Sequence, residues 1–407
     1  MDRLINTVRP YAWGSTTALP ELMGVEPDGT PQAELWMGAH PAAPSLVERA
    51  GRTQPLHHVV GDDPAAELGA VTLRRFGPRL PFLLKLLAAD APLSLQVHPD
   101  LAQAGAGFAL ENAEGVPLDA PHRNYRDGNH KPEMIVALTP FDGLCGFRAP
   151  GECAGLLGAL GLEELEPYRA ALATSPEEPA LREVFSTFLE QGAGLVEAVA
   201  RAVAREARGD GPHRAAFAVH DSIARAHPRD PGLLAALMLR HVRLAPGEGL
   251  FLGAGVPHAY LRGLGVEIMA DSDNVLRCGL TPKHVDLAEL LRVVRFSASP
   301  VRIARPTVRE DGEEVFPAPV DDFRLSVLRP GARRPAFPLD DLTPQILVCT
   351  EGRVLVTGGG GELDLSPGDS VYVPAGEPVT VTGRGTVFRA TVAAGRTGTP
   401  SRVAPER

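Results

Sequence analysis

The sequence holds four side chains of the types that bind a metal ion through nitrogen and oxygen: Gln96, His98, Glu133 and His258. Two imidazoles, a carboxylate and an amide oxygen suit Zn²⁺ with a position left for water or substrate, as a catalytic site requires. Because no thiolate belongs to this set, it selects metals weakly and would also suit Mn²⁺ or Fe²⁺. The sequence therefore predicts one divalent metal ion per chain.

The first two of these side chains lie in a stretch of strict apolar–polar alternation, Leu93-Ser94-Leu95-Gln96-Val97-His98. The period of two in a strand puts Ser94, Gln96 and His98 on one face. Such a face is expected where a strand lines a barrel interior that holds a ligand. The alternative is an ordinary amphipathic strand with a solvent-facing side, which the hexapeptide alone favours.

Glu133 follows Lys131 and Pro132 at the start of a second strand-like run, 133–138. Proline cannot donate to a β-ladder, so the strand is expected to begin there, with Lys131 and Glu133 on one face. One hypothesis makes Glu133 a metal ligand and leaves Lys131 for substrate or proton transfer. The other is a plain ion pair.

His258 follows a Gly/Pro turn, and four charged residues come after it: Glu267, Asp271, Asp273 and Arg277. This stretch is too polar for core and too short for a solvated helix. We expect it to contribute to the same site, although the composition of 271–274 alone favours an acidic turn. Another three histidines, His213, His220 and His227, are seven apart with no carboxylate at i+4 spacing, and we interpret them as surface residues.

The residue pattern changes twice along the chain, and these changes predict the elements that must position the side chains. Residues 1 to about 150 are rich in turns and strand-like runs, such as 81–88. From about 151 to 240, helical spacing predicts helices at 180–190, 193–208 and 232–244. A strand is expected at 249–255, a helix at 284–295, a Pro- and charge-rich connector at 299–320, an all-β segment to about 393, and a frayed tail at 394–407.

One internal repeat is present: residues 246–260 align without gaps on residues 367–381. Both copies read Pro-Gly-acid, a short apolar strand, a Gly-containing turn and a second strand. This pattern resembles a sequence motif of cupins, which are small β-barrels of the jelly-roll type. His258 in the first copy aligns with Val379 in the second. We therefore expect a metal ligand at this position in the first barrel and a structural role for the second.

Composition excludes several classes of function. The 407 residues carry a net charge of −10, which argues against a broad surface for nucleic acid or anionic membranes but not against a small anionic substrate. No uninterrupted apolar run reaches the roughly 18 residues of a membrane span, and the first residues lack the apolar core of a signal peptide. The four cysteines form no CxxC pattern. We expect a cytoplasmic protein, monomeric, with reduced thiols.

Several segments, in order along the chain, resemble the type I mannose-6-phosphate isomerase family: 10–15 (PYAWGS), 33–45, 81–100, 129–134 (NHKPEM), 257–261 (PHAYL) and 271–283 (DSDNVLRCGLTPK). The resemblance runs to about residue 295. It implies a mainly β fold of two cupin-type jelly-roll barrels, with a helical domain inserted in the catalytic one. The implied domains are a catalytic barrel (1–150 and 240–300), the helical insertion (151–239) and a second barrel without metal ligands (315–393).

The resemblance also implies roles for individual residues. The zinc ligands of the family match Gln96, His98, Glu133 and His258, and its active-site arginine matches Arg277. Further pocket positions, for phosphate binding or proton transfer, match Lys85, Ser94, Lys131, Glu267 and Asp273. The implied reaction interconverts mannose 6-phosphate and fructose 6-phosphate through an enediol. Lys131, Glu267 and Asp273 are all candidates for the general base.

Two other functions compete with this expectation. Cupin barrels host many chemistries, so another metal-dependent cupin enzyme is the first alternative. A sugar-phosphate-binding protein without activity is the second. The Gln ligand and the several cationic groups favour a phosphorylated sugar as the small-molecule partner.

Overall fold

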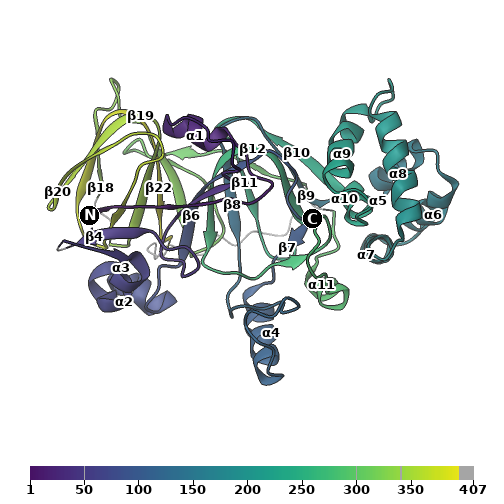
Figure 1. Ribbon diagram of the computed structural model, residues 1–407, viewed down its shortest axis with the longest axis horizontal. Coiled ribbons are helices and arrows are strands. Elements are labelled where there is room, and N and C mark those ends of the chain that lie inside the picture. The colour runs from purple at the N-terminus through teal and green to yellow at the C-terminus, as the bar shows by residue number, and fades with distance from the viewer. Residues whose placement is uncertain (50, 299, 340–341, 394–407) are drawn as a thin grey trace. The chain divides into compact units, whose positions relative to one another are not determined.

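The computed structural model describes residues 1–49, 51–298, 300–339 and 342–393, so the expected tail at 394–407 lies outside the described residues. The described chain is mainly β, with three sheets (Figure 1). It forms two compact units. Unit 1 comprises Met1–Ile5, Gly38–Phe82 and the chain from Val308 onward, and unit 2 comprises Asn6–Met37 and Leu83–Thr307.

Unit 2 contains the eleven-stranded sheet, in which β8 and β12 are central. Its strands are β2 (Thr7–Arg9), β3 (Glu34–Met37), β6 (Phe82–Ala89), β7 (Gln96–Val97), β8 (Glu133–Ala137), β9 (Phe141–Phe147), β10 (Leu239–Leu244), β11 (Gly249–Leu252), β12 (His258–Ala270), β13 (Leu276–Arg277) and β14 (Ile303–Ala304). Every residue of β6 and β8 is buried. These strands are therefore apolar on both faces, except at a few charged positions that need a separate explanation.

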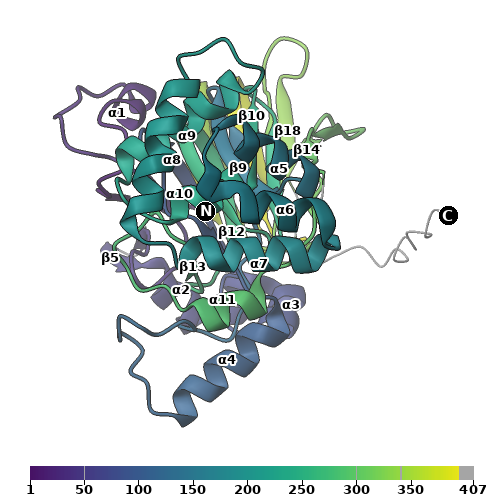
Figure 2. The same ribbon diagram turned by 90° about the vertical axis from the view of Figure 1, so that its right-hand side faces the viewer.

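Most helices of unit 2 follow β9 and precede β10 in the sequence. They are α1 (Ala18–Met23), α4 (Leu101–Ala113), α5 (Pro150–Ala159), the 3₁₀ turn η1 (Glu163–Leu165), α6 (Glu166–Thr174), α7 (Glu177–Leu189), α8 (Ala193–Glu206), α9 (Arg214–Ala226), α10 (Gly232–Leu237) and α11 (Leu287–Val293). Helices α5–α10 gather at one side of the sheet, whereas α4 projects away from it (Figures 1 and 2). One apolar cluster joins these helices to β7, β9 and β12 through residues such as Val97, Phe147 and Ala259.

Helix α9 corrects the interpretation of His220 as a surface residue. His220 is fully buried, because it falls on the same helical stripe as Phe217 and Ile223. Its ring nitrogens lie 2.7 Å from the carbonyl oxygen of Ala216 and 3.1 Å from that of Ala236 on α10. The histidine thus joins two helices, and burial lowers its pKa to about 4.

Two predicted elements are shorter than expected. The helix predicted over 232–244 ends at Leu237, and β10 takes up the rest, because its backbone pairs with β9. The strand predicted over 93–98 is a ladder only at Gln96–Val97. Leu93 still donates a backbone hydrogen bond to Tyr260, and Leu95 donates one to Gly279 and accepts one from Cys278. The helices near 180–190, 193–208 and 284–295 are confirmed as α7, α8 and α11.

Unit 1 contains the nine-stranded sheet and a two-stranded hairpin. Its elements are β1 (Asp2–Arg3), β4 (Leu46–Arg49), β5 (Arg52–Pro55), β15 (Thr307–Val308, which begins at the unit boundary), β16 (Glu314–Val315), β17 (Arg324–Leu328), β18 (Ala336–Leu339), β19 (Gln345–Gly358), β20 (Gly361–Leu365), β21 (Ser370–Val373), β22 (Val379–Thr391), α2 (Leu56–Asp62) and α3 (Pro64–Phe76). Helices α2 and α3 are absent from the sequence-based expectation, as are α1 and α4 in unit 2. The predicted connector near 299–320 contains three of the short strands.

The repeat found in the sequence is confirmed at the level of structure. β21 spans the residues that the gapless alignment pairs with β11, and β22 begins at the residue that it pairs with the start of β12. His258 opens β12, and Val379 opens β22, where it packs in an apolar cluster. A mainly β fold with an inserted run of helices is therefore confirmed. The domain boundaries stay a prediction. No helix in the described ranges is long and apolar enough to cross a membrane.

The burial of His220 predicts a pH dependence of stability. With a pKa of about 4 in the folded state and an ordinary value near 6.5 in the unfolded chain, this residue takes up a proton on unfolding at intermediate pH. Its contribution to stability is therefore lost as pH falls from about 6.5 to 4, by up to roughly 1.4 kcal/mol per pH unit. The variant His220→Gln lacks this loss. The difference in melting temperature between parent and variant should shrink between pH 7.5 and 4.5, and a constant difference would contradict the assignment.

Candidate functional site

Strand β7 sets three polar side chains in one row. It lies between β12 and β13, with Gln96 opposite His258 on one side and opposite Arg277 on the other. Residues directly opposite one another in an antiparallel ladder share a face of the sheet. Arg277, Gln96 and His258 therefore follow one another across the same face, as the sequence could not show from three segments so far apart.

Two buried carboxylates lie on the neighbouring strands β8 and β12 of the same sheet. Glu133 opens β8, and Glu267 lies opposite Ile135 of the same strand. Because Glu133 and Ile135 are two residues apart, Glu133 and Glu267 share a face. Both carboxylates are almost fully buried.

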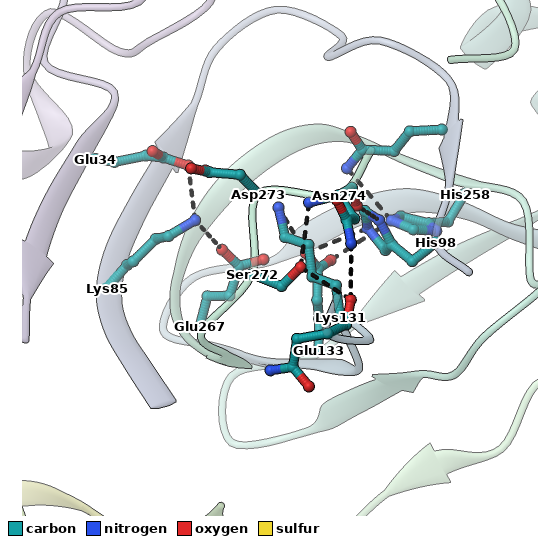
Figure 3. Close-up of polar contacts among 12 residues, drawn as sticks. Glu34, Lys85, His98, Lys131, Glu133, His258, Glu267, Ser272, Asp273 and Asn274 are labelled. Carbon is teal, nitrogen blue, oxygen red and sulfur yellow. Dashed lines mark hydrogen bonds and ion pairs between the residues drawn. The ribbon is translucent and has the colours of Figure 1, made fainter. Parts of the chain in front are cut away.

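His98, Glu133 and His258 converge on one point (Figure 3). One ligand atom from each lies within 4.8 Å of the others. The Nε2 atoms of His98 and His258 lie 3.3 and 3.5 Å from the two carboxylate oxygens of Glu133. The side-chain amide of Gln96 lies 3.4 Å from Nε2 of His258. Since the amide nitrogen and oxygen are interchangeable by a flip, Gln96 can present its oxygen there.

Unsatisfied polar atoms indicate that this cluster suits a cation. Within the described part of the chain, Nε2 of His98 and Oε2 of Glu133 have no hydrogen-bonding partner, although both are buried. A buried polar atom without a partner costs free energy that a folded protein normally avoids. A divalent cation between the two imidazoles and the carboxylate would satisfy both atoms. The donor set and its burial therefore fit a metal ion.

Protonation states at the cluster match those that metal binding requires. Burial lowers the pKa of His98 to about 4, against the opposing effect of Glu133, so the imidazole is neutral near pH 7. Burial raises the pKa of the Glu133 carboxyl, but His98, His258 and Lys131 outweigh it, and the net pKa is well below the ordinary value. Neutral imidazole and ionised carboxylate are the forms that coordinate a metal.

Backbone carbonyls fix the orientation of both imidazoles. Nδ1 of His98 lies 2.8 Å from the carbonyl oxygen of Asn274, and Nδ1 of His258 lies 2.9 Å from that of Val256. A carbonyl only accepts hydrogen bonds, so each Nδ1 carries the proton and each Nε2 presents its lone pair to the cluster.

A second buried group of charges lies on β3, β6 and β12, where Lys85 extends between two carboxylates (Figure 3). Its Nζ is 3.0 Å from Glu267 and 3.5 Å from Glu34. Burial raises the pKa of Glu267, and Glu133 and Glu34 raise it further against the charge of Lys85. The pKa of Lys85 is raised, because its two carboxylate neighbours outweigh burial. Glu34 was not among the predicted site residues, because its only signal in the sequence is its position at the start of a short apolar run.

The remaining predicted residues lie at different depths. The Nζ of Lys131 is 3.8 Å from Oε1 of Glu133, so the two side chains lie side by side as an ion pair. Arg277 is partly buried, and burial together with Arg126 lowers its pKa. Ser94 is partly buried, two residues before Gln96, whereas the side chain of Asp273 is exposed. His98, Glu133 and His258 thus form the centre, and the roles of the other residues stay predictions.

Removing one imidazole should abolish metal binding. His258→Ala leaves two ligating side chains among the three that converge, so the purified protein should lose its bound divalent metal. Arg277→Ala serves as the matched control, since Arg277 is in the same row but is no ligand, and it should keep the metal. Metal content per chain, measured by mass spectrometry of the purified proteins, checks this. A metal-replete His258→Ala protein would contradict the ligand assignment.

Comparisons with known proteins agree with this geometry. A family model for the catalytic domain of type I phosphomannose isomerase matches residues 1–150, and a cupin domain model matches residues 324–392. Mannose-6-phosphate isomerase of Escherichia coli is 42% identical over 96% of this chain and 99% of the relative. The rat protein of the same name is 33% identical over 91% of this chain and 93% of the relative.

Solved structures are similar over nearly the whole chain. A phosphomannose isomerase variant from Salmonella typhimurium superimposes with a TM-score of 0.89 at 38% identity, over 97% of this chain and 99% of the other. A mannose 6-phosphate isomerase bound with zinc and yttrium gives a TM-score of 0.88 at 38% identity, over 96% and 99%. The expected two-barrel cupin fold is confirmed. The fold, the buried site and the similarity to relatives over nearly their full length all point to one family. The chain belongs to the type I mannose-6-phosphate isomerase family of enzymes.

Proposed function

We propose that this chain interconverts mannose 6-phosphate and fructose 6-phosphate, with one zinc ion held by His98, Glu133 and His258 and by the amide oxygen of Gln96. The observation that carries the proposal is the buried cluster with two unsatisfied polar atoms, in a chain of this family. The similar structure bound with zinc supports the choice of metal. Two nitrogen and two oxygen ligands leave a position for substrate or water.

When bound, zinc supplies a Lewis acid that stabilises negative charge on a sugar oxygen. The chain's own groups have to move protons. A base removes the proton from C2 of the aldose, and O1 gains a proton to give the enediol. C1 then gains a proton and O2 loses one, which yields the ketose. The chemistry therefore needs a group whose pKa lies near the working pH.

Glu267 fits the role of this base best among the three candidates. Its carboxyl is buried, its pKa is raised, and it accepts a hydrogen bond from Lys85. In contrast, the Asp273 side chain is exposed, and Lys131 lies beside the ligand carboxylate of Glu133. Lys85, held between Glu34 and Glu267, would then donate a hydrogen bond to Glu267 and contact the bound sugar.

Arg277 is the cation best suited to the phosphate or to the charge that develops at the reacting oxygens. Lys85 already has two carboxylate neighbours, so its charge is compensated. Arg277 instead lies near other cations. Burial lowers the pKa of Arg277 most, and the charge of Arg126 lowers it further. The pKa of Lys283 is likewise lowered first by burial and then by the charges of Arg277 and Arg126. A phosphate dianion would relieve this repulsion. Ser94 and Lys131 complete the proposed substrate contacts.

We place the proposed activity in the cytoplasm. All four cysteines are unpaired and buried, and burial raises the pKa of each thiol. Free, unreactive thiols are usual in a reducing compartment.

A coupled assay tests the proposal. Fructose 6-phosphate formed from mannose 6-phosphate is measured with the purified protein, after chelation, and after zinc is added back. Turnover should vanish on chelation and return with zinc. No turnover by the folded, zinc-loaded protein would contradict the proposed reaction.

The choice of base predicts a difference between two conservative variants. Glu267→Gln removes the basic oxygen but keeps the size and a hydrogen-bond acceptor for Lys85, so kcat should fall by about 10²–10⁴-fold. Zinc content should not change. The matched control, Asp273→Asn, should lose far less. The assignment is wrong if Asp273→Asn loses kcat and Glu267→Gln does not.

A further inference from the structure

The two imidazoles of the metal cluster are anchored in different ways. His258 donates from Nδ1 to the carbonyl of Val256, two residues earlier, so its anchor belongs to the same turn. His98 donates to the carbonyl of Asn274, 176 residues away. The orientation of His98 therefore depends on how the chain holds the segment around Asn274.

Four side chains hold that segment, and we call them the clasp: Asp127, Asn129, Ser272 and Asn274. Asn129, Ser272 and Asn274 are buried. The side chain of Asn274 uses both of its ends. Its Nδ2 donates to the carbonyl oxygens of Asp127 (2.7 Å) and Asn129 (2.8 Å). Its Oδ1 accepts from the backbone N–H of Arg126 (2.7 Å).

Asp127 completes the clasp from the other side. Its Oδ2 accepts from the backbone N–H of Asp273 (2.8 Å), directly before Asn274. Its Oδ1 accepts from the hydroxyl of Ser272 (2.9 Å) and from the backbone N–H of Asn129 (2.8 Å). The carboxylate of Asp127 thus bonds to its own segment, residues 127–129, and to the facing segment, residues 272–274, and joins the two.

We propose that Asp127 and Asn274 are positioning residues for the metal site, which place the Asn274 carbonyl so that His98 keeps its proton on Nδ1 and presents Nε2 to the metal. This inference rests on the metal site of the proposed function. Neither side chain contacts the cluster itself, and both act through the backbone carbonyl. Outer-shell partners of this kind fix the tautomer and orientation of a ligating histidine.

The geometry favours this role over that of an ordinary loop tie. The bonds made by Asn274 and Asp127 join residues 126–129 to residues 272–274, the segment that carries the one carbonyl that His98 uses. The loop is also tied elsewhere, since Glu111 accepts from the backbone N–H groups of Asn124 and Tyr125. Removing the clasp would therefore free the Asn274 carbonyl while leaving another attachment of the loop in place.

Three variants test the proposal through zinc affinity, measured by competition with a chelator. Asn274→Ala and Asp127→Ala remove the clasp, and each should weaken zinc binding by about 10–100-fold. Asp127→Asn keeps one acceptor oxygen but loses the bond to the Asp273 N–H, so its zinc affinity should be intermediate. The matched control is His220→Ala, which removes a buried hydrogen-bonded side chain far along the sequence from the clasp. It should lower the melting temperature and leave zinc affinity within about twofold of the parent.

A second readout needs no metal. In zinc-free protein labelled with ¹⁵N-histidine, the ring signals of His98, identified by their loss in His98→Gln, should report the Nδ1–H tautomer in the parent. In Asn274→Ala and Asp127→Ala they should report a mixture of tautomers. Folded clasp variants with the parent's tautomer and zinc affinity would overturn the proposal, and Asp127→Asn decides if the alanine variants do not fold. Failure of isomerase activity in the parent, with these shifts present, would overturn only the proposed function.

Discussion

The buried carboxylate of Glu133 is the constraint on which the site depends. An ionised carboxylate inside a sheet of apolar residues costs more free energy than a marginally stable fold can spare without compensation. His98, His258 and Lys131 surround it, and His98 is itself kept neutral by burial. Even so, an oxygen of Glu133 and a nitrogen of His98 have no partner among the described residues. The same atoms that make the interior costly make it a site for a divalent cation.

The nine-stranded sheet of unit 1 compensates its buried polar groups with side chains of its own. Glu133 lies opposite Leu252, and Gln345 lies opposite Val373, the residue that the repeat pairs with Leu252. An amide thus replaces the carboxylate. Arg389 donates to Gln345 (2.6 Å) and to the buried Glu313 (2.8 Å), so this interior carries an internal ion pair. With Val379 in place of His258, the related motif builds packing in one unit and a polar cluster in the other.

Patterns that depend on one segment were predictable, and those that depend on a partner segment were not. The repeat predicted a pair of related strands in each sheet, and alternation put Gln96 on a polar face. His220 was interpreted as a surface residue because no carboxylate stands at i+4 spacing, and the carbonyl of Ala236 on α10 that its ring contacts lies in another segment. Glu34 and the clasp escaped notice because their partners lie far along the chain. The family resemblance supplied Arg277 and Lys85, whose roles no periodicity indicates.

The most direct test of this account is a titration of metal-free protein with zinc, in which bound zinc and mannose 6-phosphate turnover are followed together. A site built on one buried carboxylate and two imidazoles predicts that turnover rises in proportion to bound zinc and stops rising at one ion per chain. Full turnover before zinc is added, or turnover that requires a second ion, would contradict it.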